Sequence, residues 1–196
     1  KDGRSLTIDQ AHAFCITQRL PAGSTPTVLP VGDQVFGASC STTIPLDKKG
    51  KFQNVLLGQT ITLGLNIRLD GQLGSLILKG TVLTTIGSNP GPDGMCGTED
   101  DTPNGASIVV KHIPQTVLDA LAALYGTRSV SNLFDLANRA LGGMTTGGAS
   151  LPDINQAVSA INEGFDGCRF LQGFTDEAKN VQVDNTSITD DKNITL

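Results

Sequence analysis

The residues best suited to chemistry are four carboxylates in a Gly- and Pro-rich stretch, residues 87–105: Asp93, Glu99, Asp100 and Asp101. Ca²⁺ prefers several oxygen ligands on a flexible loop. Carboxylates buried together without a cation would be costly, so they are either solvated or joined by a cation. The sequence therefore predicts either a calcium site or a solvated acidic turn pinned by Cys96.

An EF-hand is the strictest form of the calcium prediction, and this stretch does not satisfy it. Counted from Asn89, the third ligand position is Gly91, which has no side-chain oxygen. The twelfth is Asp100, where an EF-hand has a bidentate Glu. Any calcium binding would therefore use a less regular arrangement of the same acidic residues.

Other catalytic motifs have little support in the sequence. The two histidines, His12 and His112, lack a neighbouring Ser or Cys motif, and no G-x-S-x-G, P-loop or G-x-G-x-x-G pattern is present. Sugar-binding clefts usually offer aromatic stacking faces, yet the chain has no Trp and a single tyrosine, Tyr125. We therefore expect a non-enzymatic protein, with a calcium-dependent carbohydrate- or small-ligand-binding module as the alternative.

Charge and hydropathy narrow the expected partners. The formal net charge is −5, and the cations are scattered without a basic stripe, so we expect no nucleic-acid partner. No apolar run approaches the ~20 residues of a membrane span. The sequence carries no signal-peptide pattern, so we expect any export signal to have been removed or left out.

The four cysteines indicate the compartment. Cys15, Cys40, Cys96 and Cys168 are widely separated and form no C-x-x-C pair, which argues against a structural zinc site. An even number of cysteines in such a chain suits two disulfides in an oxidising compartment. Of the three pairings we favour Cys15–Cys40 with Cys96–Cys168; the alternative is four buried free thiols.

The longest apolar block, Leu56–Leu69, has two interpretations. Its apolar residues alternate with Thr, Gly, Asn, Arg and Asp, as in a half-buried strand. A four-residue recurrence also fits one stripe of a helix; its members are Leu57, Ile61, Leu65 and Leu69. The pattern alone favours the strand, with the helix kept as the alternative.

Helices are predicted on both sides of this block. Thr7 and Gln10 have the spacing of a capping box, which predicts a helix over Ile8–Leu20. Three further helices have clear start and stop signals. The first is Gln115–Tyr125 after Pro114, the second is capped by Ser129 or Ser131, and the third is capped by Ser150 and contains Ile154–Ile161.

Strand signals are weaker. The sequence predicts a short extended piece at Thr27–Leu29, one or two strands in Gly74–Ile86 and a strand at Ser107–Lys111. Residues 41–54 are expected to turn at Asp47–Gly50. The density of Gly, Pro, Asn and Asp in residues 87–105 predicts no regular structure there.

Residues 175–196 differ from the rest because they are polar with sparse apolar residues. They are either a frayed tail or an extended segment that pairs with a neighbouring subunit by β-augmentation. In the second case the assembly residues would be Val181, Val183, Ile194 and Leu196.

The order of these pieces resembles a recurrent module of large secreted bacterial surface proteins, which has no established activity. The likeness covers roughly residues 3–172, and the segments that carry it are residues 3–14, 20–29, 54–70, 73–78, 92–101, 129–143 and 153–168. In such modules the stretch matching Leu56–Leu69 is often richer in Ala, which favours a helix. The resemblance implies an extracellular or cell-surface location and supplies no catalytic residues.

Together these observations predict a helix-rich α+β single domain with short strands, two disulfides and an extended C-terminal tail. Residues 1–174 would form the secreted module and residues 175–196 the tail. The expected role is structural or adhesive at a bacterial surface, with copies of itself or another surface protein as partner. Through its tail the chain would be a self-assembling subunit of an extracellular polymer.

Overall fold

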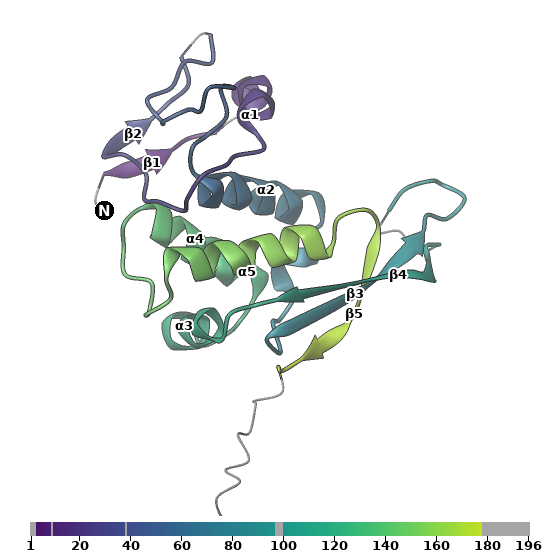
Figure 1. The fold of residues 1–196 in the computed structure, drawn as a ribbon. Helices are drawn as coiled ribbons and strands as arrows, with labels where there is room; N and C mark the ends of the chain where they lie inside the picture. Colours follow the sequence, from purple (N-terminus) through teal and green to yellow (C-terminus); the bar gives the residue numbers. More distant parts are fainter. Residues whose placement is uncertain (1–2, 9, 38, 97–99, 178–196) are drawn as a thin grey trace, which may run out of the picture.

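The computed structural model describes residues 3–8, 10–37, 39–96 and 100–177, and the helix-rich α+β prediction is confirmed (Figure 1). The α-helices of this part are α1 Ala13–Arg19, α2 Val55–Leu69, α3 Gln115–Tyr125, α4 Val130–Leu141 and α5 Leu151–Gly164. The strands are β1 Arg4–Leu6, β2 Gly32–Gln34, β3 Val82–Asn89, β4 Thr102–His112 and β5 Arg169–Thr175. Two 3₁₀ turns, η1 Gln10–His12 and η2 Leu73–Ser75, complete the described elements. None of the helices in these ranges is long and apolar enough to cross a membrane.

The ambiguous apolar block is a helix, α2. Its N-cap is Asn54, whose side chain accepts a hydrogen bond from the Leu57 N–H at 3.3 Å. The Thr60 hydroxyl donates to the Leu56 carbonyl at 2.7 Å, so this buried polar group is satisfied within the helix. Helical geometry buries Leu63 and leaves Leu65 exposed, whereas a strand would place both on one face.

The three C-terminal helices begin and end at the signals predicted for them. Ser129 caps α4 by accepting from the Asn132 N–H at 3.2 Å, and Ser150 caps α5 in the same way. Gly126 ends α3 with a φ of 70°, a left-handed conformation that favours glycine. The apolar faces of α2, α3, α4 and α5 meet in one core, and α5 contacts α2, α4 and β4.

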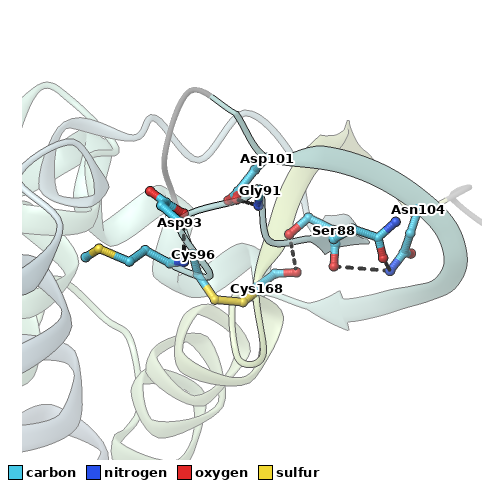
Figure 2. Close-up of a disulfide and its surroundings, with 9 residues drawn as sticks. Ser88, Gly91, Asp93, Cys96, Asp101, Asn104 and Cys168 are labelled. Atoms are coloured by element: carbon cyan, nitrogen blue, oxygen red, sulfur yellow. Dashed lines mark hydrogen bonds between the residues drawn. A yellow bond between two sulfur atoms is a disulfide. The ribbon is translucent and has the colours of Figure 1, made fainter.

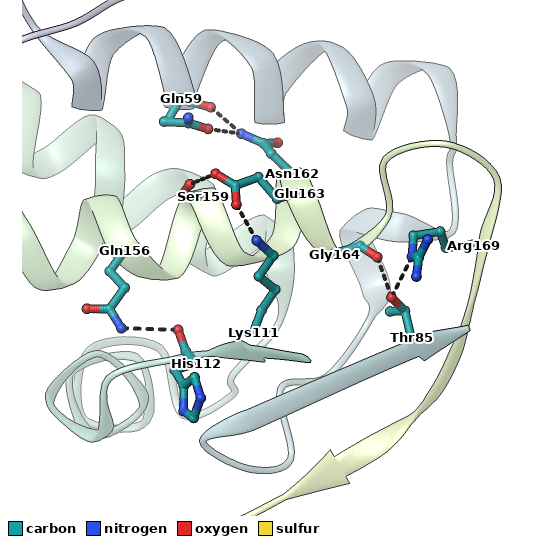
Figure 3. Close-up of polar contacts among 10 residues, drawn as sticks. All are labelled: Gln59, Thr85, Lys111, His112, Gln156, Ser159, Asn162, Glu163, Gly164 and Arg169. Atoms are coloured by element: carbon teal, nitrogen blue, oxygen red, sulfur yellow. Dashed lines mark hydrogen bonds and ion pairs between the residues drawn. The ribbon is translucent and has the colours of Figure 1, made fainter. Parts of the chain in front are cut away.

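Asn162 joins α5 to α2 through polar contacts (Figure 3). Its amide Nδ2 donates to the Gln59 carbonyl at 2.9 Å and to Gln59 Oε1 at 2.7 Å. Its Oδ1 accepts from Asn66 Nδ2 at 3.1 Å. These bonds between neutral groups fix the register of the two helices at the end nearest the sheet.

The N-terminal region differs in detail from the prediction. The predicted helix Ile8–Leu20 is present as η1 followed by α1, and the N-cap of α1 is His12, without a side-chain capping bond, so Thr7 does not cap it. No strand is assigned at the predicted extended piece, Thr27–Leu29. The strand lies instead at β2, which pairs in parallel with β1. The turn at Asp47–Gly50 is confirmed, since the Gly50 N–H donates to the Asp47 carbonyl at 2.9 Å.

The larger sheet has the order β4-β3-β5, and all its pairs are antiparallel. Strand β4 is longer than the predicted Ser107–Lys111, and β3 continues past the predicted end at Ile86 to Asn89. Of Gly74–Ile86, the first part forms η2 and only the last part belongs to β3. The prediction that residues 87–105 lack regular structure is wrong at both ends, because Asn89 pairs with Thr102. Turn-forming residues are tolerated in this hairpin because β3 and β4 slip in register at Ile86–Ser88.

The strand β5 was not predicted, and it attaches the sheet to the helical core. The Thr85 hydroxyl is buried and donates to the carbonyl of Gly164, the last residue of α5, at 2.6 Å (Figure 3). The same oxygen accepts from Arg169 Nε at 3.1 Å, and the Arg169 Nη2 donates to the Ser107 carbonyl at 2.9 Å. One arginine therefore links all three strands.

Both predicted disulfides are present. Cys15 in α1 is joined to Cys40, across a sequence separation of 25. Cys96 is joined to Cys168, just before β5, across a separation of 72. The first bond links nearby segments of the N-terminal region. The second links the β3–β4 loop to the residue just before β5.

Candidate functional site

The acidic loop lies between β3 and β4, beside the Cys96–Cys168 disulfide (Figure 2). Asp93 Oδ1 accepts from the Met95 N–H at 2.8 Å, and Asp101 Oδ1 accepts from the Gly91 N–H at 3.1 Å. Gly91 is needed here because a Cβ at this position would collide with the Asp100 carboxylate. The two aspartates therefore stabilise turns through backbone amides.

The calcium prediction is not resolved by this geometry. Within residues 3–8, 10–37, 39–96 and 100–177, no group of three or more His, Cys, Asp or Glu side chains is placed to hold a metal ion. Of the predicted ligands Asp93, Glu99, Asp100 and Asp101, Glu99 lies outside the described residues. Calcium binding by this loop thus stays a prediction.

A polar groove lies between the end of β4 and α5. We define it by the residues around a pocket of about 370 Å³: Val110, Lys111, His112, Asn155, Gln156, Ser159, Ala160 and Glu163. Figure 3 shows its polar contacts: Lys111 Nζ pairs with Glu163 Oε2, and the Ser159 hydroxyl donates to Glu163 Oε1 at 2.5 Å. Gln156 Nε2 donates to the His112 carbonyl at 3.4 Å. The groove therefore borders β4 with neutral polar side chains and with one pair of opposite charges, Lys111 and Glu163.

The contacts with Lys111 and Ser159 lower the pKa of Glu163, and the hydrogen bond from Lys111 is the larger cause. A carboxyl group with a lowered pKa stabilises the folded state above its unfolded pKa, and this contribution is lost as the pH falls through the folded value. Because the Glu163 side chain is half exposed, solvent screens the pair.

We expect Lys111→Met to raise the pKa of Glu163 toward its ordinary value of 4.5. The reason is that methionine keeps the length of the side chain and removes the charged donor. A carboxyl-detected NMR titration of both proteins measures the shift. Ser159→Ala serves as the comparison and should raise the pKa less, and an unchanged Glu163 titration in Lys111→Met would contradict the ion pair.

The opposite face of the sheet is mostly apolar, and we call it the outer sheet face. Register places its members on one side of three strands: Val82, Thr84, Ile86, Ile108, Val110 and Phe170. The polar His112 and Thr175 lie on the same side, opposite Val82 at one end of the face, and Val110 and His112 also border the groove. The helices lie on the other side of the sheet, over Leu83 and Thr85 (Figure 1). Ile108 is 60% exposed and Val110 is 50% exposed. Sequence analysis did not identify this face, because only the pairing of distant strands assembles it.

The two histidines lie in different surroundings. His12 packs near Phe36, with ring centroids 5.6 Å apart. His112 ends β4, and its Nδ1 lies 2.6 Å from Glu177 Oε1. The predicted assembly residues Val181, Val183, Ile194 and Leu196 lie outside the described residues.

Comparison with known proteins adds no relative: no family model, no curated protein and no solved structure matches this chain. The resemblance to secreted bacterial surface modules therefore stays a prediction.

Proposed function

We propose that this chain is a non-catalytic structural or adhesive module that acts outside the cell or at its surface by associating with copies of itself. The outer sheet face carries the proposal. Its exposed Ile108 and Val110 adjoin the half-buried Ile86 and Phe170 across neighbouring strands. Contiguous apolar side chains on the surface of a folded protein mark an interaction site.

The two disulfides support the extracellular part of the proposal. Disulfides form and persist in oxidising compartments. Here one cross-link holds the N-terminal region and the other holds the sheet. A module fixed in this way would keep its outer sheet face in shape while exposed to the outside medium.

Association would pack the outer sheet faces of two copies against each other. Sheets pack about 10 Å apart with their side chains interdigitated. A two-fold arrangement uses the same patch on both copies, so each copy of Ile108 and Val110 would be buried once. Another surface protein with a similar apolar face is the alternative partner.

The double variant Ile108→Thr with Val110→Thr tests this proposal. Threonine keeps the preference for β-structure, so β4 should persist. Burial of these half-exposed side chains contributes about 1 kcal/mol each. A two-fold dimer buries four of them, so the dissociation constant should rise about a thousandfold. Light scattering over a concentration series measures the change.

The matched control is Val31→Thr, because Val31 is 72% exposed and lies outside the outer sheet face. It should leave association unchanged. A native protein that stays monomeric at every concentration would overturn the proposal. So would a double variant that associates as well as the native chain does.

A further inference from the structure

Strand β4 lies at one edge of the larger sheet, and this edge is free in the described part of the chain. The Ile113 N–H donates to the Thr81 carbonyl at 2.7 Å, toward the β3 side. Because main-chain groups alternate along an antiparallel strand, those of Ile108, Val110 and His112 point away from β3. No strand of the described part pairs with them. An open edge beside apolar side chains invites the addition of another strand.

Charge does not protect this edge. Natural proteins often guard an edge strand with a lysine that projects into solvent. Lys111 is the lysine in β4, and its ammonium group is bound to Glu163 on α5. The charge is therefore turned toward the helix, and the edge stays accessible.

The described chain ends beside this edge. After β5, Asp176 Oδ1 accepts from the Thr81 N–H at 3.3 Å, and the Glu177 N–H donates to Thr81 Oγ1 at 2.8 Å. Glu177 then contacts His112 at the end of β4. Since β3 separates β5 from β4, residues 176–177 cross the end of the sheet from one edge to the other.

The two sides of the edge differ in polarity. The outer sheet face is mostly apolar, whereas the groove on the α5 side carries Asn155, Gln156 and Ser159. Asn155 Oδ1 is buried and accepts no hydrogen bond from the described residues. A strand that fits here needs apolar side chains on one side and polar ones on the other. The sequence after Glu177 alternates in this way: Asn180, Val181, Gln182 and Val183.

We propose that residues 179–183 form a fourth strand, antiparallel to β4, on the free edge of their own chain. The register that matches the apolar residues places Val181 opposite Val110 and Val183 opposite Ile108. Asn180 and Gln182 then face the polar groove. The chain's own segment is favoured over that of a second copy because attachment beside the edge gives it a high effective concentration.

This inference rests on the proposed function and deepens it. The added strand widens the outer sheet face by Val181 and Val183, so the surface used for association would be built partly from the tail. It would also pair the open main-chain groups of β4, which leaves the face, and not the edge, as the contact between copies.

Hydrogen exchange measured by NMR tests the inference, with the full chain compared with a variant that ends at Glu177. The measurement is made at a concentration where light scattering shows a monomer. We expect the Ile108 and Val110 amides to exchange at least about tenfold more slowly in the full chain. The Val109 amide faces β3 and should change less.

Two point variants test the register. Val181→Asp places a charge on the apolar face and should abolish the protection of the Val110 amide. The matched variant Gln182→Asp adds the same charge on the groove side and should preserve it. Unchanged exchange of core amides such as Leu133 shows that both variants are folded.

The outcomes separate this inference from the proposed function. Equal exchange in the full and shortened chains would overturn the fourth strand, as would equal effects of the two aspartates. Protection that develops only as the protein dimerises would assign the strand to a second copy and overturn pairing within one chain. The light-scattering test with the Ile108→Thr, Val110→Thr double variant is independent of these outcomes.

Discussion

A variant in which alanine replaces both Cys96 and Cys168 should unfold with a free energy lower by about 4 kcal/mol. The bond closes a loop with a sequence separation of 72, and such a cross-link stabilises mainly by reducing the entropy of the unfolded chain. Cys96 is exposed and Cys168 half-buried, so the variant loses little packing. Urea unfolding at neutral pH, without reductant, measures the difference.

The same experiment carries its own control. Because the cross-link restrains the unfolded chain, its removal should also raise the denaturant m-value, which reports the surface exposed on unfolding. The Cys15–Cys40 bond closes a shorter loop, with an entropic contribution of about 3.5 kcal/mol. Its cysteines are buried, so alanine there also leaves a small packing defect. A loss below about 1 kcal/mol at Cys96 and Cys168 would contradict the entropic explanation.

Leu63→Ala should destabilise the protein by about 2–5 kcal/mol, the usual cost of truncating a fully buried leucine. Leu63 is 0% exposed on the inner face of α2. The matched variant is Leu65→Ala, two residues along the same helix, where the side chain is 47% exposed. Because alanine is also the best helix former, that change should cost less than about 1 kcal/mol.

This pair of variants decides between the two interpretations of the apolar block. Residues two apart lie on the same face of a strand and on different faces of a helix. A helix therefore predicts unequal losses, and a strand predicts similar ones. Equal destabilisation by Leu63→Ala and Leu65→Ala in thermal or urea unfolding would contradict α2.

The two largest losses of stability, in the cysteine variant and in Leu63→Ala, concern different parts of the structure. The Cys96–Cys168 bond holds the β3–β4 loop against β5 and so supports the outer sheet face. Leu63 supports the helical core that carries the sheet. If the cysteine variant keeps a folded core but no longer associates, the disulfide is needed to hold the association surface in shape.

Much of the helical part was predictable from the sequence because its signals are local. Serine caps at Ser129 and Ser150 and the stop at Gly126 act within one or two turns of the chain. The helical spacing of apolar residues in 115–161 is visible in the sequence itself, without knowing which other segments pack against these helices. The favoured disulfide pairing, one local bond and one long-range bond, is the pairing that the structure shows.

The sheet and its surfaces were decided by tertiary structure. Whether Leu56–Leu69 is a helix or a strand depended on which of its side chains could be buried. As a helix, this segment packs against α4 and α5, and that packing stabilises the helical form. The candidate site was missed for the same reason. Ile108, Val110 and Phe170 carry no motif, and they form one face only because β3 pairs with strands that are distant in sequence. By itself the sequence determined the capped helices, which depend on local chemistry, and it favoured the correct pairing of the four cysteines. The free edge and the outer sheet face depend on long-range strand pairing, which only the folded chain contains.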